Sequence, residues 1–303
     1  MEEKKEQSTI KTKSLSRLYN KTYKFLLVIP LILTLISLIY LGNFFSHHSD
    51  FMYKDITLSG GTSITIQGNI DSDKLESSLK QEFSDISIRK LTEIRTHESL
   101  AVIIESSSQP DVLKASIEKV LGYNLTEENS STEFSGSTLS QGFYKQLIIA
   151  LIIAFFLISC VVFVLFRTIV PSLAVVFSIF SDILISLAIV DFIGLRLSAA
   201  GISAFLMLVG YSVDTNILLT TRAIKNREGE LNERIFRAFK TGSFMTCTAL
   251  LAVIPAFFIV SGLPDSFSQI FLILAIGLFA DLINTWLTNA GLIKWHCEKK
   301  GIN

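Results

Sequence analysis

The chain has 303 residues, of which 50% are hydrophobic, and its 27 basic residues balance 27 acidic ones. The apolar residues are gathered in long blocks, so the composition excludes an ordinary soluble domain and is typical of an integral membrane protein. Cys160, Cys247 and Cys297 have no CxxC spacing, and none lies in the long polar segment after the first block. No disulfide framework and no CxxC metal or redox motif is therefore indicated.

Six apolar blocks are long enough to cross a bilayer, because a spanning helix needs about 20 apolar residues. They cover residues 25–45, 146–166, 169–193, 199–221, 243–261 and 268–293. The first block follows a polar tail at 1–24, exceeds a signal-peptide core in length and lacks a small-x-small cleavage site, so we interpret it as a retained anchor. The sequence thus predicts a polytopic α-helical membrane protein with six transmembrane helices.

Residues 46–141, between the first two blocks, form a segment long enough for a folded domain. The pattern predicts strands at 61–67, 86–94, 100–105 and 132–138, and helices at 71–83 and from Pro110 onward. This β-α-β-β-α-β order is that of a ferredoxin-like α+β sandwich. Gly60 and Gly61 lie where the chain enters the first strand, and glycine there suits a sharp bend or a close backbone approach. We interpret the pair as an outer-domain hinge, with an ordinary strand bulge as the alternative.

Basic residues are placed asymmetrically around the six blocks, which predicts the orientation of the chain. They are concentrated in the N-terminal tail, in the loop at 222–240 and in the tail at 294–303, with Arg167 between the second and third blocks. With six spans these all fall on one side, which the rule assigns to the cytoplasm. We therefore expect a multi-pass cell-membrane protein with both termini cytoplasmic, an extracytoplasmic domain at 46–141 and a five-helix transmembrane domain at 142–293.

Carboxylates inside the apolar blocks are the clearest chemical signal. Asp182, Asp214 and Asp281 lie in the third, fourth and sixth blocks, and a charge at the bilayer centre costs about 2.5–3.5 kcal/mol on insertion scales. Such acids usually face the bundle interior or a water path, which favours a proton-handling role. The alternative is a structural hydrogen-bond network. Gly210, one turn before Asp214, lets a helix approach closely, so we expect Asp214 to be buried against a neighbour.

Amides and hydroxyls accompany these acids and predict a polar helix interface. The sixth block carries polar residues at i, i+3, i+4 and i+7, namely Asp281, Asn284, Thr285 and Thr288. This spacing places them on one face of an otherwise apolar helix, and Asn216 lies in the fourth block. A small or polar stripe of this kind marks a helix–helix contact in a membrane. Plain packing within the chain is the alternative explanation.

Motifs of common enzyme chemistries are absent from the sequence, which has no GxxxxGK[ST], HExxH or GxSxG. The histidines, His47, His48, His97 and His296, lie outside the predicted spans. Neither a His-based membrane catalyst nor a buried metal site is therefore indicated. We expect a protein that is not an enzyme, with no catalytic residue, metal, cofactor or nucleic-acid partner.

Three segments resemble a known family. GYSVDTNILL at 210–219 is similar to the fourth-helix motif of the SecF family of protein-export membrane proteins in its archaeal form. GLFADLINTW at 277–286, with NAG at 289–291, resembles that family's last helix. LSGGT at 58–62 is similar to its glycine-pair motif. The arrangement of one helix, a large outer domain and five further helices also agrees with the family.

The resemblance implies a partnership with a SecD-like membrane subunit, in a unit of the resistance-nodulation-division superfamily type. Such a unit assists the passage of unfolded secreted polypeptides through the Sec translocation channel, and it uses the proton gradient to move its outer domains. In this interpretation Asp214 matches the family's proton-path carboxylate, and Asp281 joins the proton pathway. Lys240 stands near the start of the fifth helix, where bacterial relatives have an arginine.

Three other functions are weighed against this one. A small-molecule or lipid exporter of the same superfamily usually carries both halves in one longer chain. An intramembrane aspartyl protease needs YD and GxGD motifs, but Asp214 follows Val213 and Asp281 follows Ala280. A passive scaffold subunit, which leaves proton transfer to its partner, is compatible with the sequence.

Overall fold

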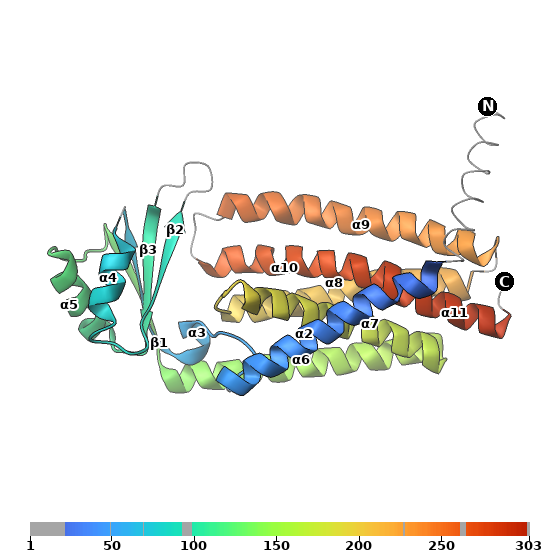
Figure 1. Ribbon diagram of the computed structural model, residues 1–303, viewed down its shortest axis with the longest axis horizontal. Helices are drawn as coiled ribbons and strands as arrows, with labels where there is room; N and C mark the ends of the chain where they lie inside the picture. The colour runs from blue at the N-terminus through green and yellow to red at the C-terminus, as the bar shows by residue number, and fades with distance from the viewer. Residues whose placement is uncertain are drawn as a thin grey trace, which may run out of the picture.

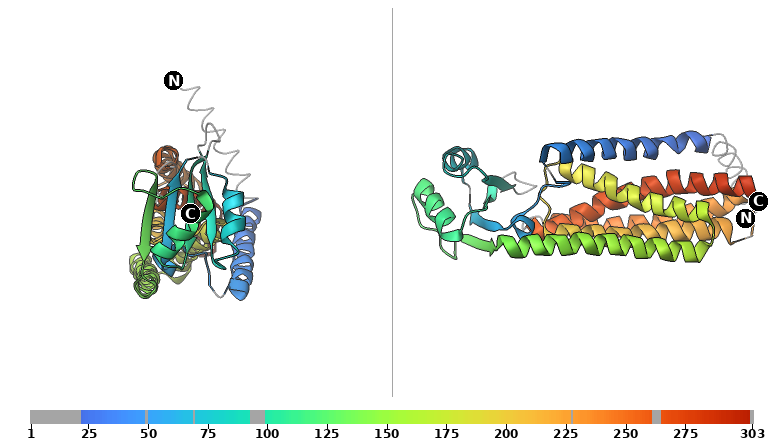
Figure 2. Two further views of the ribbon diagram at one scale, coloured as in Figure 1. Left: turned by 90° about the vertical axis from the view of Figure 1, so that its left-hand side faces the viewer. Right: turned by 90° about the horizontal axis from the view of Figure 1, so that it is seen from below.

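The structure, a computed structural model, describes residues 22–48, 50–68, 70–92, 99–226, 228–260 and 265–301. The molecule is elongated, and a small domain built on a β-sheet stands at one end of a bundle of long helices (Figure 1). The first long helix starts, and the last one ends, at the opposite end of the bundle. Figure 2 shows the same bundle from two further directions.

Among the described residues, six helices are long and apolar enough to cross a membrane, as the sequence predicts. They are built from α2 (Val28–His48), α6 (Ser137–Phe166), α7 (Ile169–Phe192), α8 (Ala199–Ile224), α9 (Leu231–Val260) and α10 (Asp265–Ile283). The last span continues from α10 through a π-helical turn, η1 (Asn284–Asn289), into α11 (Ala290–Lys300). Because α10 and α11 are joined in this way, they act as one long helix with a widened turn in its middle.

Helix α9 begins at Leu231, twelve residues before the predicted start at 243. Its first turns are amphipathic, with Leu231, Ile235 and Ala238 buried and charged residues on the exposed face. A search for continuous apolar sequence misses such turns, because the charges lower the local hydropathy although the buried stripe is intact.

The predicted β-α-β-β-α-β order is the order of elements in the small domain. It consists of β1 (Gly61–Gln67), α4 (Ser72–Leu79), β2 (Ser87–Thr92), β3 (Ser99–Ser106), α5 (Pro110–Leu121) and β4 (Ser130–Ser135). The four strands form one sheet in the order β2-β3-β1-β4, and all three neighbouring pairs are antiparallel. The predicted last strand was too long at its end, because Gly136 is already the N-cap of α6.

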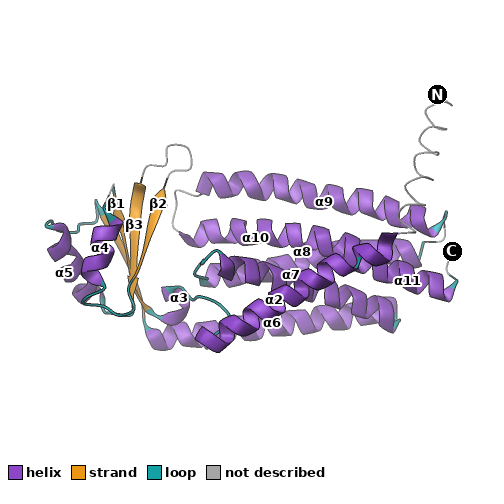
Figure 3. Cartoon of the chain, viewed as in Figure 1, coloured by secondary structure: helices purple, strands orange, loops and turns teal. Residues whose placement is uncertain are grey.

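The two faces of the sheet have different neighbours. Helices α4 and α5 lie on the side of the sheet away from the bundle (Figure 3). Ile64 of β1 and Ile104 of β3, which are paired in register, pack with Leu75 of α4 and Ile117 of α5 in this domain's core. Alternation along β3 then turns Glu105 to the other face, toward the bundle.

The domain is joined to the bundle by a short helix that the sequence analysis did not predict, α3 (Ile56–Ser59). It follows α2, contacts the start of α6 and leads directly into β1. Four residues of helix are too few to show an apolar period, so sequence patterning could not detect this element. Within the bundle, α8 is central and contacts α6, α7, α9 and α10.

Candidate functional site between the membrane helices

Asp182 of α7 is completely buried and is held by two neutral donors. Ser212 Oγ of α8 donates a hydrogen bond of 2.5 Å to Oδ2, and Asn284 Nδ2 of η1 donates one of 2.6 Å to Oδ1. Hydrogen bonds of this kind to a charged acceptor each stabilise by about 1.5–3 kcal/mol. The carboxyl group of Asp182 therefore ties α7 to both neighbouring elements.

Asp281 of α10 is the second buried acid, with 1% of its surface exposed. Thr215 Oγ1 of α8 lies 3.1 and 3.0 Å from its two carboxyl oxygens, and Thr285 Oγ1 donates to Oδ1 at 2.9 Å. Thr215 follows Ser212 by three residues, so adjacent positions on one face of α8 bind the two acids. The two carboxyl groups are therefore bound one helical turn apart along α8.

A chain of amides extends the cluster away from the two acids. Asn216 Nδ2 donates to the carbonyl oxygen of Ser212 at 2.8 Å, and its own Oδ1 accepts from Asn289 Nδ2 at 2.7 Å. Thr220 Oγ1, one turn further along α8, donates to the carbonyl oxygen of Asn216 at 2.8 Å. All of these side chains are buried, so polar groups line this part of the helix interface without a break.

The local backbone explains why so many polar residues meet here. Ser178, Ser181 and Ser186 of α7 are buried at the interface, and small residues let membrane helices approach closely. In a π-helix the hydrogen bonds run between residues five apart, so Asn284 and Asn289 share a face that an α-helix would not give them. The π-helical turn thus directs both amides into the cluster.

Along α8 and α10 the polar groups next to the two acids continue toward one end of the bundle, whereas on α7 Ser186 lies one turn from Asp182 toward the sheet. Helices α8 and α10 both run from the sheet end of the bundle to its far end, so the amides after Asp281 and Ser212 lie toward the far end. On the sheet side, Phe205 and Leu208 of α8 pack with Leu278 of α10 in an apolar cluster. The acids therefore stand at the inner end of a polar zone that is closed by hydrophobic packing toward the sheet domain.

Several buried atoms of this zone have no hydrogen-bond partner among the described residues. They are Ser178 Oγ, Ser181 Oγ, Asn284 Oδ1, Trp286 Nε1, Thr288 Oγ1 and Asn289 Oδ1. Buried polar groups in proteins are commonly bridged by ordered water, which needs two to four such partners. No group of three or more His, Cys, Asp or Glu that could hold a metal ion occurs in the part of the chain that the structure describes.

Comparison with known proteins identifies the family. Residues 115–299 match the family described as "Protein export membrane protein SecD/SecF, C-terminal". The chain belongs to the SecD/SecF family. It is 35% identical over 283 residues to the protein-export membrane protein SecF of Methanothermobacter thermautotrophicus, covering 92% of this chain and 94% of that one. The SecF of Methanocaldococcus jannaschii is 34% identical over 281 residues, covering 91% and 96%.

Solved structures agree with this SecF assignment at the level of the fold. The crystal structure of SecDF from Thermus thermophilus, a translocon-associated membrane protein, matches with a TM-score of 0.72 at 17% sequence identity. The match covers 91% of this chain and 38% of that one, so the SecF-family chain spans well under half of the larger protein. SecDF in its super-membrane-facing form gives a TM-score of 0.59, covering 93% and 39%.

The expectation that Asp214 is buried against a neighbouring helix is wrong within this SecF-family chain. Asp214 is exposed on α8, and a Cβ added to Gly210 would meet no atom within 4 Å. The reason is helical geometry: Asp214 lies about 200° around the axis from Ser212, at about 100° per residue. Since Ser212 and Thr215 face the two acids, Asp214 must point out of the bundle.

Lys240 does not stand opposite Asp214. It is an exposed residue of α9. Arg222 Nη1 of α8 donates to Thr241 Oγ1 at 2.8 Å, which places Lys240 near the level of Arg222. Arg222 is eight residues beyond Asp214, roughly 12 Å along the helix axis at 1.5 Å per residue.

The glycine pair lies at a close backbone contact. Gly60 and Gly61 have φ values of 85° and 132°, a region that other residues rarely adopt. A Cβ on Gly60 would come within 2.3 Å of the Cα atom of Ser137, at the start of α6, and one on Gly61 within 2.4 Å of the carbonyl oxygen of Ser106. Both glycines are therefore required by the way the strand passes α6 and β3.

Sequence reasoning found part of this site and missed part of it. Asn216, Asn284, Thr285, Thr288 and Asp281 are all buried at the helix interface, and all but Thr288 have a described hydrogen bond within the cluster. Asp182 was predicted as a membrane acid without an assigned role, and the residues that sequence reasoning missed are Ser212, Thr215, Thr220 and Asn289. A serine pattern around Asp182 was the available signal, because small residues at helical spacing mark the face of a membrane helix that meets another.

Proposed function

We propose that this chain is the SecF-type subunit of the Sec export machinery, and that with a SecD-like partner it uses the proton gradient to assist translocation of unfolded polypeptides. The buried pair Asp182 and Asp281, at the inner end of the polar zone between α8 and α10, is the observation that carries the proton-coupled part. Membership of the SecD/SecF family supports the export part. The proposed role is not enzymatic: the side chains take up and release protons and form no covalent bond with the translocated polypeptide.

The partners of the two acids support a role in holding a proton. Ser212, Asn284, Thr215 and Thr285 are neutral, and no lysine or arginine is hydrogen-bonded to either carboxyl group among the described contacts. Two ionised carboxylates in a low-dielectric interior, without a cation, are strongly unfavourable. A proton held by the pair removes one charge and leaves the other well hydrogen-bonded. Loss and gain of that proton would then change the contact between α7, α8 and α10.

The polar zone gives this proton a route in one direction. Asn216, Asn289 and Thr220 form a series of hydrogen bonds toward the far end of the bundle, and buried atoms near them can bind water. Hydrophobic packing around Leu208 closes the other direction. Alternating access requires that this packing open when the sheet domain or a partner moves, and the same acids would then take up protons from the other side.

Asp214 supports the presence of a membrane partner. It is exposed on a membrane helix, where a charged aspartate facing lipid would cost about 2.5–3.5 kcal/mol. Gly210 and Met207 are exposed on the same stripe of α8, and small residues suit a close helix contact. We propose that a SecD-like subunit covers this face and supplies a donor or cation to Asp214. The proton-path role implied for Asp214 would then belong to the interface between the two subunits, and Lys240 would act there only after a rearrangement.

The orientation and the outer domain complete the proposal. The antiparallel order β2-β3-β1-β4, with α4 and α5 on one face, supports a ferredoxin-like domain at 46–141. Arg167 and the basic loop at 222–240 lie at the opposite end of the bundle from this domain, which supports cytoplasmic termini and an extracytoplasmic sheet domain in the cell membrane. In this position the domain, hinged at Gly60 and Gly61, can meet a polypeptide that leaves the Sec channel.

The proton role is tested with the full chain and its SecD-like partner in vesicles that contain the Sec channel. Translocation of a secretory polypeptide is measured with and without an imposed proton gradient. Asp182→Asn and Asp281→Asn should assemble normally and lose the gradient-dependent stimulation, whereas Asp73→Asn, an exposed acid of α4, should keep it. If both membrane variants kept full gradient-dependent stimulation, the two acids would have only a structural role in the hydrogen-bond network.

A further inference from the structure

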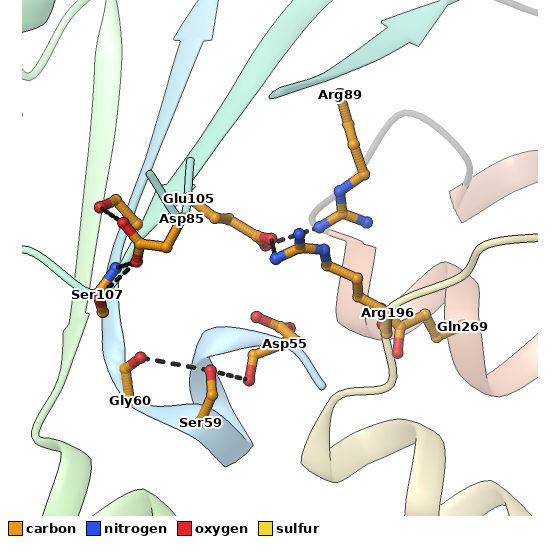
Figure 4. Close-up of polar contacts among 10 residues, drawn as sticks. Asp55, Ser59, Gly60, Asp85, Arg89, Glu105, Ser107, Arg196 and Gln269 are labelled. Atoms are coloured by element: carbon orange, nitrogen blue, oxygen red, sulfur yellow. Dashed lines mark hydrogen bonds and ion pairs between the residues drawn. The ribbon is translucent and has the colours of Figure 1, made fainter. Parts of the chain in front are cut away.

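The sheet domain and the membrane bundle meet at a cluster of charged side chains that the function above does not use (Figure 4). Glu105 of β3 is 3% exposed and is bound on both sides by arginines. Arg89 Nη2 of β2 lies 2.7 Å from its Oε1, and Arg196 Nη1 lies 3.4 Å from its Oε2. Because Arg196 belongs to the connection between α7 and α8, one carboxylate links the sheet to the bundle.

Arg196 is itself anchored in the bundle. Gln269 Nε2 of α10 donates to the carbonyl oxygen of Arg196 at 2.9 Å, and Gln269 Oε1 accepts from both the backbone N–H and the hydroxyl of Ser198 at 2.9 Å. The backbone that carries the guanidinium is therefore attached to two membrane helices. A force on Glu105 is transmitted through this connection to the sheet-side ends of α8 and α10.

Asp55, the N-cap residue of α3, lies in the same junction. It is 6% exposed, and its Oδ1 has no hydrogen-bond partner among the described residues. Its backbone N–H donates to the carbonyl oxygen of Leu197 at 2.9 Å. The N–H of Leu197 in turn donates to the carbonyl oxygen of Tyr53 at 2.7 Å. The linker that carries the domain is thus attached to the residue that follows Arg196, and a second acid is buried beside Glu105.

We propose that Glu105, held between Arg89 and Arg196, and Asp55 beside it form a proton-sensitive clamp that fastens the sheet domain to the membrane bundle. A protonated Asp55 is neutral and leaves the Glu105 carboxylate to both arginines. An ionised Asp55 places a second negative charge in the junction, where it competes for the arginines and repels Glu105. The domain is then held less tightly and can swing away from the bundle.

The surroundings of Asp55 set the pH range of this clamp. Burial, followed by the charge of Glu105, raises the pKa of Asp55 to about 7, and Arg89 opposes this shift. Arg196 reaches the junction from the bundle, whereas Lys54 and Asp50 pair with each other at 2.6 Å. An exposed aspartate ionises near a pKa of about 3.9. The docked domain therefore holds more protons than the free one, so docking weakens as pH rises from about 4 to about 7 and is constant above that range.

The distance between the two parts of the protein measures docking directly. The experiment uses the full-length chain with its native cysteines replaced. Spin labels are attached to cysteines engineered at two exposed positions, Ala115 of α5 and Ile193 just after α7. At pH 5 the parent should give one narrow distance distribution, and at pH 8 a second, longer distance should appear. Asp55→Asn should keep the narrow distribution at both pH values.

Charge-neutral variants test the clamp itself. Glu105→Gln and Arg196→Gln should each increase the long-distance population, and the double variant should be no worse than either single one, because both remove the same contact. Lys90→Gln is the control for loss of a charge, since Lys90 follows Arg89 on β2 but pairs with Asp73 of the same domain at 3.8 Å. If Glu105→Gln fails to fold, Arg196→Gln still tests the clamp, because Arg196 lies outside the sheet domain. Parent-like distributions in Arg196→Gln, or an unchanged pH dependence in Asp55→Asn, would overturn the proposal.

Discussion

Asn284 of η1 and Asp182 of α7 are joined by a hydrogen bond of 2.6 Å although 102 residues separate them in the chain. The bond connects the π-helical turn of the last span to the third membrane helix at the level of the buried acids. It is one of the two side-chain hydrogen bonds that the Asp182 carboxyl group accepts from neighbouring elements.

Asn284→Ala should lower the free energy of unfolding by about 1–3 kcal/mol, because Asp182 Oδ1 loses its donor while it stays buried. The measurement is thermal or denaturant unfolding in detergent. Thr288→Val is the control: Thr288 Oγ1 is buried without a described partner, so replacing the hydroxyl with a methyl should be neutral or stabilising. Equal losses of unfolding free energy in the two variants would show that the hydrogen bond to Asp182 does not stabilise the fold.

Asp214→Asn should have different effects on the isolated chain and on the complex. Since Asp214 is exposed in the chain alone, its replacement should change the stability of the purified chain by no more than about 0.5 kcal/mol. Association with a SecD-like partner should weaken by about tenfold, or about 1.4 kcal/mol, if the partner supplies a donor to this carboxyl group. Copurification and titration of the two subunits measure the strength of their association. Thr248→Val, on the exposed face of α9, is the control. A loss of stability in the isolated chain without loss of association would contradict the proposed interface.

Gly60→Ala should be more harmful than Gly68→Ala. Both glycines have positive φ, at 85° and 115°, but only a Cβ on Gly60 meets neighbouring backbone, at Ser137. A backbone conformation that favours glycine costs roughly 1–3 kcal/mol for another residue, and the clash adds to this cost only at Gly60. Unfolding experiments compare the two variants, and Gly42→Ala, in open space on α2, serves as the unstrained control. Similar losses of stability in Gly60→Ala and Gly68→Ala would mean that the start of α6 can shift to accommodate the added methyl group at little cost.

The orientation of the chain is tested by labelling from outside intact cells. A cysteine engineered at Ser77, exposed on α4, should react with an impermeant thiol reagent, whereas one at Lys225, just beyond α8, should not. The exposed native cysteines Cys160 and Cys247 are replaced first so that they give no background. Permeabilised cells, in which both sites should react, show that the Lys225 site is accessible. The opposite pattern would reverse the proposed topology.

The elements that depend on local sequence were predictable. A run of about 20 apolar residues must form a spanning helix, because a helix satisfies its backbone hydrogen bonds internally. Alternation placed β1 at Gly61–Gln67, and Asp71 caps α4 by accepting from the backbone N–H groups of Asp73 and Lys74. The motifs of the fourth and sixth spans were long enough to indicate the family. Each of these features is carried by neighbouring residues, so a single segment contains the whole signal.

The functional contacts required the tertiary structure. A sequence shows that Asp182, Asp214 and Asp281 lie in membrane helices, but the face each one occupies depends on which helices surround it. Ser212 and Asp214 are two residues apart, yet the first binds Asp182 and the second points outward. The junction between the sheet domain and the bundle also required the tertiary structure. Arg196 and Glu105 are 91 residues apart in the chain and meet only when the sheet docks on the bundle. Local periodicity sets which residues share a face of one helix or strand, whereas packing between elements decides what that face meets.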